Sequence, residues 1–554
     1  MKRRLNRHAT EIMDTTINFD RLPGGSRLFL DFLYDPQRVG AFFPWPFRSD
    51  REFASCAGLL DNQEFNRAAI VDILQRQNTE YGADEAALAN IKRLGDSRTL
   101  TVFTGQQVGL YGGPLYTVFK ALGAIGHARL LEEKLERPVV PVFWMAADDH
   151  DFAEVRWTGF PGPDNRSQRI SYDPVAEPER IPTSQIVFDD RITDVHQSLL
   201  AVRMSTEFSS LVDDALAECY RPGVTMAAAF GRWMARVFAG TGLVFFSPAD
   251  AEAKRLAAGL FERELRSPKC TAQALELVNL RLVESGYHLQ VSHPPTHTNL
   301  FYFNGQRVPL DVVREGVISD GTTEQSAEKW VELLAREPEN FSPGVLMRPV
   351  LQNVLFPTIA YIAGPSEVTY WAQARALFEV FGAVQPVVIS RPFATLVERK
   401  IGKAVDKLNL TLPEVLTDPE GVVNKVAQRS FPAELAERFA KTRECFTEHL
   451  AELEKIVASF EPTLEKTFRQ GAGKMNLEIN SLEKKAFQAH KRKNEIIREQ
   501  VYKISGHLYP EGKLQERVFG LPYYLNKYGF GLVNYLAEHL RLDTGDHQLI
   551  ELDM

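Results

Sequence analysis

One acidic cluster in the chain has residue types that can perform chemistry. Three carboxylates and an imidazole follow the apolar run Val139–Met145, in the order Asp148-Asp149-His150-Asp151. Carboxylates can hold a divalent cation or bind an ammonium group, and an imidazole can act as a general base. The simpler alternative is a solvated acidic loop that caps the next segment. We favour the functional interpretation and assign Asp149, His150 and Asp151 as candidate catalytic residues, with no metal assigned to them.

A second candidate segment is the glycine-rich stretch from Thr104 to Tyr116. It combines four glycines with two adjacent glutamines ahead of an expected helix. Glycine lets a backbone approach a ligand closely, and helix N-termini attract anions. The stretch is neither a P-loop nor a dinucleotide fingerprint, and a plain strand-to-helix turn is the alternative. We predict a cofactor phosphate site formed by Thr104, Gly105, Gly109, Gly112 and Gly113, with substrate contacts from Gln106 and Gln107.

Two arginines and one helix start complete the candidate site. Arg348 and Arg391 each precede a proline, in turns that are expected to be constrained. An arginine fork binds carboxylates or phosphates in two places at once, although a surface ion pair is its commoner use. Glu367 and Tyr370 lie one helical turn apart, at the start of a helix, and can face the same cleft. We assign these four residues to substrate binding.

Five apolar runs, each ending in a short polar turn, must position these residues. They are Leu100–Phe103, Val139–Met145, Leu243–Phe246, Ile359–Ala363 and Val387–Ile389. Apolar strands that alternate with helices predict an α/β fold, a doubly wound parallel sheet covered on both faces. Such sheets bind ligands outside the carboxyl ends of their strands. The turns are therefore expected to converge on one rim, although they lie far apart in sequence.

The chain divides into a core and a helical region. Residues 1–392 are the predicted core, with an insertion at about 155–343 that contains a β-hairpin near 300–312, marked by Asn304-Gly305. In residues 393–554, apolar side chains recur at three- and four-residue steps, the spacing of a seam on a long helix. We predict an α-helical antiparallel coiled coil, its two helices joined at Gly471 and Gly473. The C-terminal end is expected to fold back on the core, and the seam to form a homodimer.

The overall composition narrows the classes of partner. The chain has 554 residues, a net charge of −8 and 25% charged residues, which is typical of a globular protein with two or more units. The acidic balance disfavours nucleic acid. No apolar stretch has membrane-spanning length and no signal core follows the N-terminus, so a cytoplasmic protein without a membrane partner is expected. The four cysteines lack metal-type spacing.

Six collinear segments resemble the signature blocks of the bacillithiol biosynthesis cysteine-adding enzymes. They are Thr104–Lys120, Pro141–Val155, Ser342–Gln352, Ala363–Trp371, Ile389–Pro392 and Gln515–Gly529. The resemblance extends from about Asp31 to Glu538, nearly the whole chain. One departure is visible, because the family's acidic block usually begins with glutamate and here Asp148 replaces it. The shorter side chain reaches less far, which puts a role for that first carboxylate in doubt.

The resemblance implies both a fold and an activity. The fold is a Rossmann-like core related to class I nucleotidyl-transferring ligases, with inserted segments and a C-terminal coiled coil used for dimerisation. The activity is the joining of cysteine, through its carboxyl, to the amine of glucosaminyl malate. A carboxylate does not condense with an amine in water unless it is activated, so ATP is expected as a co-substrate, with Mg²⁺ as an open option.

The residues suggest roles within such a reaction. The segment Gly105–Gly113 would cradle nucleotide phosphate, Asp149 and Asp151 would bind an amino group or Mg²⁺, and His150 would be the base. Arg348 and Arg391 would bind the malyl carboxylates or phosphate. Activation through an adenylate and through an acyl-phosphate both stay open. So do two other functions: a metal-dependent amide hydrolase acting on a sugar conjugate, and a coiled-coil scaffold that senses a nucleotide.

Overall fold

The computed structural model describes residues 16–554 except residues 23, 48, 418 and 494. The chain forms two compact units. The first combines the chain up to Leu396 with Lys513–Met554, and the second is Val397–Gly512. The candidate site lies entirely within the first unit.

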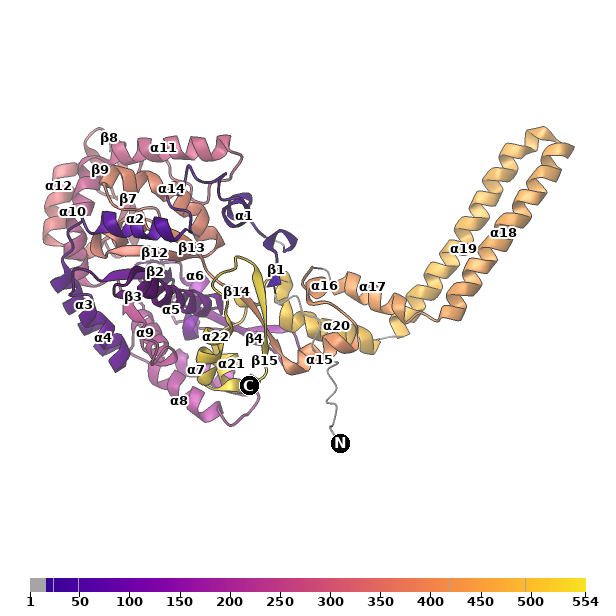
Figure 1. The fold of residues 1–554 in the computed structure, drawn as a ribbon, viewed down its shortest axis with the longest axis horizontal. Coiled ribbons are helices and arrows are strands. Elements are labelled where there is room, and N and C mark those ends of the chain that lie inside the picture. The colour runs from indigo at the N-terminus through magenta and orange to yellow at the C-terminus, as the bar shows by residue number, and fades with distance from the viewer. Residues whose placement is uncertain (1–15, 23, 48, 418, 494) are drawn as a thin grey trace. The chain divides into compact units, whose positions relative to one another are not determined.

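A five-stranded parallel sheet is the centre of the first unit (Figure 1). Its strands, in sequence order, are β2 (Leu100–Gln106), β3 (Val139–Met145), β6 (Val244–Phe246), β12 (Thr358–Ala363) and β13 (Val387–Ser390). Their spatial order is β13-β12-β2-β3-β6, and every neighbouring pair is parallel. All five predicted strands are therefore present, and the α/β fold class is confirmed.

Helices cover both faces of this sheet because its strands are apolar along their whole length. On one face, α2 (Asp50–Leu60) and α5 (Tyr116–Leu135) pack against Leu100, Val102 and Val139. On the other face, the rings of Phe103, Trp144, Phe246 and Phe356 contact one another. The helix α14 (Pro365–Phe381) begins immediately after β12.

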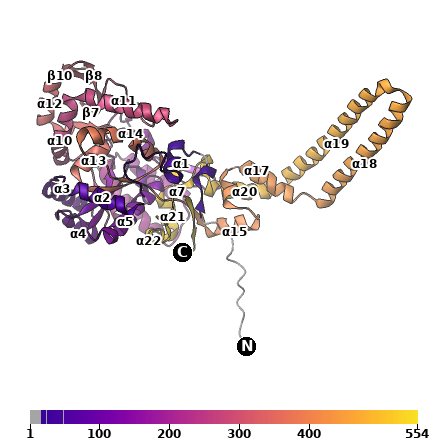
Figure 2. The same ribbon diagram turned by 45° about the horizontal axis from the view of Figure 1, so that its top comes forward.

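The remaining helices of the first unit surround this core. They are α1 (Arg27–Tyr34), α3 (Arg67–Glu80), α4 (Glu85–Arg93), α6 (Phe152–Val155), α7 (Arg191–Val202), α8 (Ser209–Cys219), α9 (Met226–Val237), α10 (Ala251–Arg266), α11 (Pro268–Glu284), α12 (Ala327–Arg336), α13 (Arg348–Leu355), α21 (Leu521–Tyr528) and α22 (Gly531–His539). Figure 2 shows several of these helices in a second view.

Three smaller sheets complete the first unit. The strands β4 (Trp157–Pro161) and β5 (Ser167–Ser171) form an antiparallel pair. A five-stranded sheet has the order β10-β9-β8-β7-β11, with β7 (His297–Phe303), β8 (Arg307–Arg314), β9 (Val317–Ser319), β10 (Glu324–Ser326) and β11 (Phe341–Pro343). The strands β7 and β8 pair where the sequence predicts a hairpin, and Gly305 in their turn has a φ of +107°. The strand β15 (His547–Leu552) lies between β1 (Thr16–Ile17) and β14 (Phe393–Glu398).

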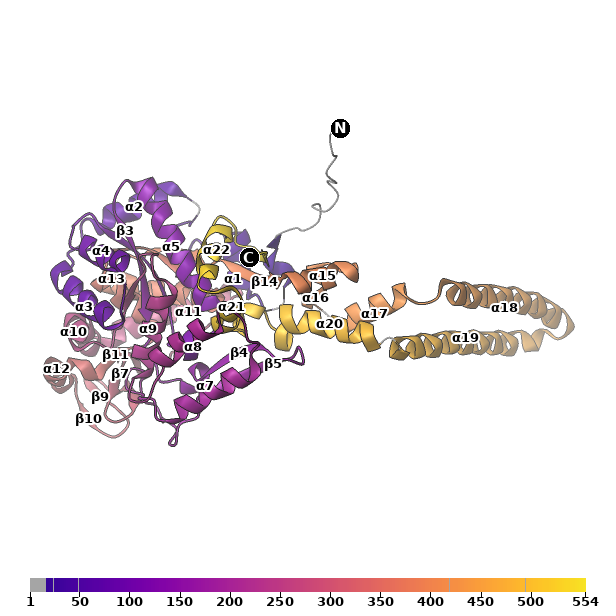
Figure 3. The same ribbon diagram turned by 90° about the horizontal axis from the view of Figure 1, so that it is seen from below.

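The second unit is helical. Its helices are α15 (Arg399–Lys407), α16 (Leu412–Thr417), α17 (Pro419–Arg429), α18 (Ala433–Phe460), α19 (Glu465–Lys493) and α20 (Glu495–Leu508). The two long helices, α18 and α19, run side by side in opposite directions in all three views (Figures 1, 2 and 3). This is the predicted antiparallel coiled coil.

The joint between α18 and α19 differs from the prediction. The chain turns at Glu461–Leu464, whereas Gly471 and Gly473 lie inside α19. Pro462 has no N–H with which to continue α18, and Glu461 adopts an extended conformation just before it. A glycine inside a helix costs only about 1 kcal/mol relative to alanine, so the glycines do not end α19.

Candidate functional site

A pocket of about 600 Å³ lies at the carboxyl ends of the parallel strands. Every strand contributes a residue that follows it: Gln107 after β2, Asp148 after β3, Pro248 after β6, Gly364 after β12 and Arg391 after β13. The turns that the sequence predicts to converge therefore do meet at one rim. The reason is the parallel topology, which sends every carboxyl end to the same edge of the sheet.

The structure brings some of the predicted site residues to this pocket and not others. Those that line it are Gly105, Gln106, Gln107, Asp149, Arg348, Glu367, Tyr370 and Arg391. Those that do not line it are Thr104, Gly109, Gly112, Gly113, His150 and Asp151.

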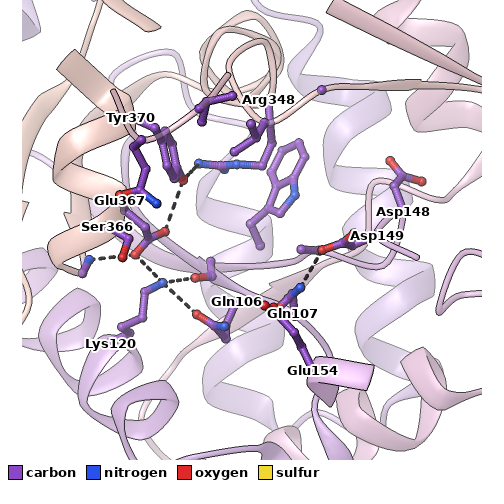
Figure 4. Close-up of a pocket in the computed structure, with 18 of the residues that line it drawn as sticks. Gln106, Gln107, Lys120, Asp148, Asp149, Glu154, Arg348, Ser366, Glu367 and Tyr370 are labelled. Atoms are coloured by element: carbon purple, nitrogen blue, oxygen red, sulfur yellow. Dashed lines mark hydrogen bonds and ion pairs between the residues drawn. The ribbon is translucent and has the colours of Figure 1, made fainter. Parts of the chain in front are cut away.

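A buried lysine organises one side of the pocket. Lys120, in α5, has only 2% of its side chain exposed, and its Nζ lies 2.5 Å from the Oε2 atom of Glu367. It also donates to the Gly105 carbonyl and, at 3.1 Å, to the Oε1 atom of Gln106 (Figure 4). Burial lowers the pKa of Lys120, and the Glu367 carboxylate opposes that shift. This lysine fixes the position of both Gln106 and Glu367.

Glu367 is held as a carboxylate. Besides Lys120, it accepts hydrogen bonds from the Tyr361 hydroxyl at 2.6 Å and from the Gly364 N–H at 2.7 Å. Burial alone would raise its pKa, but the charge of Lys120 and these hydrogen bonds outweigh that effect, so the pKa of Glu367 lies below its ordinary value. Each of these donors stabilises the charged form.

Arg348 adds a second cation beside this carboxylate. Its Nη2 donates to the Tyr370 hydroxyl at 3.2 Å and its Nη1 to the Gln352 Oε1 atom at 3.1 Å. Its guanidinium also lies over the Tyr361 ring, 5.1 Å from the centroid. Burial opposes its charge, but the two tyrosines and Glu367 outweigh burial and raise the pKa of Arg348. Arg348 is therefore a fixed positive charge in the pocket wall.

Arg391 lines the pocket but is already paired. Its Nη2 lies 2.6 Å from the Oε1 atom of Glu516, and both side chains are almost completely buried. Its Nη1 donates to the Pro392 carbonyl, and Glu516 also accepts from the Ala394 N–H. Arg391 thus ties the segment around Glu516 to the rim, which leaves it fewer hydrogens for a ligand than the sequence suggests.

We define the cationic side of the pocket by the cations Lys120, Arg348 and Arg391 and their carboxylate partners Glu367 and Glu516. We define the acidic side by the carboxylates Asp148, Asp149 and Glu154 and the cations Lys254 and Arg307. Figure 4 shows Lys120, Glu367 and Tyr370 on one flank of the pocket and Asp148 and Asp149 on the other, with Gln106 and Gln107 between them.

The acidic side is built around two adjacent aspartates. Asp148 lies 2.6 Å from the Nζ atom of Lys254, whose side chain is 2% exposed. Asp149 accepts the Gln107 Nε2–H at 2.6 Å through Oδ2 and the His150 backbone N–H at 2.8 Å through Oδ1. Asp149 is the more exposed of the two, with 34% of its side chain accessible against 17% for Asp148.

His150 is not placed as the predicted base. The Nη1–H of Arg307 donates to its Nδ1 at 3.1 Å, while the same guanidinium donates to Ser342 and to the Pro343 carbonyl. Burial, and then the charge of Arg307, lower the pKa of His150. The ring is therefore neutral, with its proton on Nε2, because Nδ1 must accept. An Nδ1 that already accepts a guanidinium hydrogen cannot take a proton from a substrate.

The later glycines of the glycine-rich stretch, Gly109, Gly112 and Gly113, pack against protein and do not line the pocket. Gly112 has a φ of +91°, and a Cβ there would lie 2.9 Å from the Trp233 Nε1 atom. The start of α5 is also covered, because the Leu115 N–H donates to the Phe519 carbonyl at 2.8 Å. The glycines are required for this packing. Gly109, Gly112 and Gly113 therefore do not fit the predicted cradle for ATP phosphates.

The two sides of the pocket carry opposite net charge. By these definitions the cationic side has three cations and two carboxylates, and the acidic side has three carboxylates and two cations; Arg517, a further cation that lines the pocket, is counted on neither side. The net charge is therefore +1 on the cationic side and −1 on the acidic side. Such a pocket is suited to a ligand with an acid group at one end and an ammonium group at the other.

Several residues in or beside the pocket were not predicted from the sequence. Tyr361 is hidden inside an apolar strand, and Glu154 and Arg517, which both line the pocket, look like ordinary surface charges in sequence. Lys254 and Arg307 lie in the insertion, where no local motif marks them. Only their packing under the strand ends reveals them.

The described part of the chain gives no grouping of three or more His, Cys, Asp or Glu side chains that could hold a metal ion. The pairing of Asp148 with Lys254 accounts for one carboxylate that a metal would need. Among the helices that the structure describes, none has the length and apolar character needed to cross a membrane.

Comparison with known proteins covers nearly the whole chain. Residues 13–392 match the family model described as the N-terminal Rossmann-like domain of bacillithiol biosynthesis BshC, and residues 394–552 match its C-terminal coiled-coil domain. The chain is 36% identical over 522 residues to a protein of Koribacter versatilis, a match that covers 93% of this chain and 96% of that relative.

Two further relatives show the same full-length similarity. A protein of Salinibacter ruber is 32% identical, with 94% of this chain and 96% of the relative covered. A protein of Symbiobacterium thermophilum is 33% identical, with 97% of this chain and 100% of the relative covered. All three relatives carry the name "Putative cysteine ligase BshC". With both domain models matched and the Rossmann-like core and coiled coil present in order, the chain belongs to the BshC family of bacillithiol biosynthesis.

Proposed function

We propose that this protein is the cysteine ligase of bacillithiol biosynthesis, which joins the carboxyl of cysteine to the amine of glucosaminyl malate. The observation that carries the proposal is the pocket of opposite charges at the carboxyl edge of the parallel sheet. The names of the full-length relatives support the same reaction.

The pocket suits the groups that this reaction must hold. Glucosaminyl malate carries malyl carboxylates and a sugar amine, so its ends have opposite charge. The carboxylates would bind at the cationic side, where Arg348 can offer its planar fork. The amine would bind at the acidic side, where Asp149 and the Gln107 carbonyl can accept its hydrogens.

The reaction forms one bond and moves one proton. The amine nitrogen attacks the activated carboxyl carbon of cysteine, the activating group leaves with one carboxyl oxygen, and the nitrogen loses a proton. We assign the Asp149 carboxylate to receive that proton, because it lines the pocket and the His150 Nδ1 atom is occupied by Arg307.

ATP is proposed as the co-substrate, with Mg²⁺ as its companion ion. When bound, ATP supplies the activation that a free carboxylate lacks. The glycine-rich turn does not fit the phosphates, so we assign no phosphate contacts to Gly109, Gly112 or Gly113. Activation through an adenylate releases AMP, whereas activation through an acyl-phosphate releases ADP.

The direct test is to incubate the pure protein with cysteine, glucosaminyl malate and ATP and to follow the products by mass spectrometry. We expect an amide product of the two substrates, together with AMP or ADP. Asp149→Asn is expected to lower the rate by about 10²–10⁴-fold, the range for losing a general base. Wild-type protein that forms no amide, or that hydrolyses amides without ATP, would refute the proposal.

We also propose that the coiled coil pairs with a second copy of the chain. No residue of α18 is fully buried in the described chain, and its seam leaves large apolar side chains exposed. They include Leu435, Phe446, Leu453, Ile456 and Phe460. Light scattering should give the mass of a dimer for the wild type and of a monomer for Leu453→Glu. A monomeric wild type at micromolar concentration would contradict this pairing.

A further inference from the structure

The neighbouring side chains of Gln106 and Gln107 are both in the pocket, and each is tied to a different charged group. Gln106 is the last residue of β2, and Gln107 is the first residue after it. An amide side chain can present either an N–H donor or a carbonyl acceptor, and its partner decides which. We propose that these two amides are locked in opposite orientations and so dictate which end of the substrate binds at which side of the pocket.

Lys120 fixes the orientation of Gln106. Its ammonium contacts the Gly105 carbonyl and the Glu367 carboxylate, which are both acceptors, and its third contact is the Gln106 amide at 3.1 Å. A protonated lysine only donates, so the amide atom beside it is the carbonyl oxygen. The Nε2–H₂ group of Gln106 is therefore turned away from Lys120. One of its hydrogens reaches the Tyr116 hydroxyl at 3.4 Å, and the other is available to a ligand.

Asp149 fixes the orientation of Gln107 in the opposite sense. The Oδ1 atom of the carboxylate accepts the backbone N–H groups of His150 and Asp151, and Oδ2 lies 2.6 Å from the Gln107 amide. A carboxylate only accepts, so the amide atom beside it is Nε2. The Oε1 carbonyl of Gln107 is left to face a ligand as an acceptor.

The two amides therefore form an ordered donor–acceptor pair. Gln106 offers an N–H beside the cationic side, and Gln107 offers a carbonyl beside the acidic side (Figure 4). A ligand in the productive direction has its acid group on the Gln106 donor and its ammonium group on the Gln107 acceptor. In the reverse direction, an acid oxygen would meet a carbonyl oxygen, and an ammonium would meet an N–H. Both contacts are repulsive, which is how a site rejects a wrong orientation.

This inference rests on the proposed function only for the identity of the substrate, because any ligand with an acid end and an amine end would be oriented in the same way. It can therefore be tested without turnover. We choose succinate as the acid probe and glucosamine as the amine probe, and we measure the binding of each to the full chain by ligand-observed NMR titration.

The same substitution at the two positions should have opposite consequences. Gln106→Glu keeps an acceptor for Lys120 but replaces the ligand's donor with a negative oxygen, so succinate should bind at least about tenfold more weakly, the effect of losing one hydrogen bond to a charged group. Glucosamine binding should be unchanged. Gln107→Glu removes the donor to Asp149 but keeps an acceptor facing the ligand and adds a negative charge on the acidic side. Glucosamine should therefore bind at least as tightly as to the wild type, and succinate binding should not improve.

Methionine has nearly the shape of glutamine but no hydrogen-bonding amide, so it tests each position separately. Gln106→Met should weaken only succinate and Gln107→Met only glucosamine, each by about tenfold. Tryptophan fluorescence on thermal unfolding checks that every variant is folded. A single probe that is weakened alike by both methionine variants would overturn the inference. So would folded variants that bind both probes like the wild type, or a wild type that binds neither probe. A wild-type protein that shows the expected binding of both probes but has no ligase turnover would count against the proposed function alone.

Discussion

Two buried lysine–carboxylate pairs stand on opposite sides of the pocket and are nearly identical in their burial. Lys120 and Glu367 approach to 2.5 Å, and Lys254 and Asp148 to 2.6 Å. In both pairs the lysine side chain is 2% exposed and the carboxylate 17% exposed. Burial lowers the pKa of both lysines, and the partner carboxylate opposes the shift in each case.

The pairs differ in what else each partner holds. Lys120 also donates to the Gly105 carbonyl and to Gln106, and Glu367 also accepts from Tyr361 and the Gly364 N–H. The Lys254–Asp148 pair has no comparable set of additional hydrogen bonds in the described chain. Similar burial therefore does not mean similar function: the first pair fixes the geometry of the cationic side, whereas the second mainly neutralises one carboxylate.

The largest expected effect is on stability, when the lysine of each pair is replaced by methionine. Lys120→Met removes a donor that three acceptors share, and we expect it to lower the free energy of unfolding by about 3–5 kcal/mol, the cost of breaking a buried ion pair. Lys254→Met leaves one carboxylate beside Arg307 and should cost about 1–3 kcal/mol. Urea unfolding followed by tryptophan fluorescence measures both costs, because all six tryptophans lie in the first unit. Equal costs would show that the extra hydrogen bonds of Lys120 contribute nothing.

A substitution of Arg348 tests whether the cationic side binds the acid group of a ligand. Arg348→Met should weaken succinate binding by about 100-fold, because it removes a charged donor beside the carboxylate probe. Glucosamine binding should stay unchanged, since the acidic side is untouched. Arg348→Lys is the matched control, which keeps the charge but loses the planar fork and should recover only part of the affinity. An equal loss for both probes would mean that the pocket as a whole had collapsed.

The pH dependence of stability tests the state of His150, next to the acidic side. The folded-state pKa of His150 lies below its ordinary value of 6.5, because burial and Arg307 disfavour the charged ring. As pH falls through 6.5, the unfolded chain takes up a proton that the folded chain resists, so this histidine's contribution to stability is present above pH 6.5 and is lost below it. The slope contributed by one such group is at most about 1.4 kcal/mol per pH unit.

His150→Asn should remove this contribution, since its Oδ1 can accept from Arg307 without titrating. The measurement is the free energy of unfolding between pH 5 and 7 in the variant and in the wild type, again by tryptophan fluorescence. Identical pH slopes in the two proteins would contradict the assigned neutral ring.

The smallest expected effect concerns Glu154. This carboxylate is exposed, so its charge is well screened. Glu154→Gln should weaken glucosamine binding by about two- to fivefold, the size of an exposed ion pair. Glu133→Gln, at an exposed position of α5 that does not line the pocket, is the matched control and should have no effect. A stronger succinate affinity in Glu154→Gln, from the loss of a repelling charge, would place this carboxylate with the cationic side.

The positions of the five strands, and the carboxyl edge of the sheet as the place of the site, could be predicted from the sequence alone. Each of the five strands is apolar along its length and is followed by a polar turn, and this local pattern is sufficient to specify a parallel sheet with its turns on one rim. The coiled coil follows from its seam in the same way, but the position of its joint does not. Proline and glycine both interrupt the pattern, and only Pro462 ends the helix.

The tertiary structure was needed to show which charged side chains pair with one another and which protonation state each of them has. Lys254 and Arg307 come from the insertion, and their packing under the strand ends neutralises Asp148 and fixes the tautomer of His150. The sequence of the glycine-rich turn predicts a phosphate cradle, but Gly112 serves close contact with Trp233, and Gly109 and Gly113 lie against each other. The physical reason is that periodicity reports which face of an element is buried, whereas charge state and hydrogen-bond direction depend on partners that are remote in sequence.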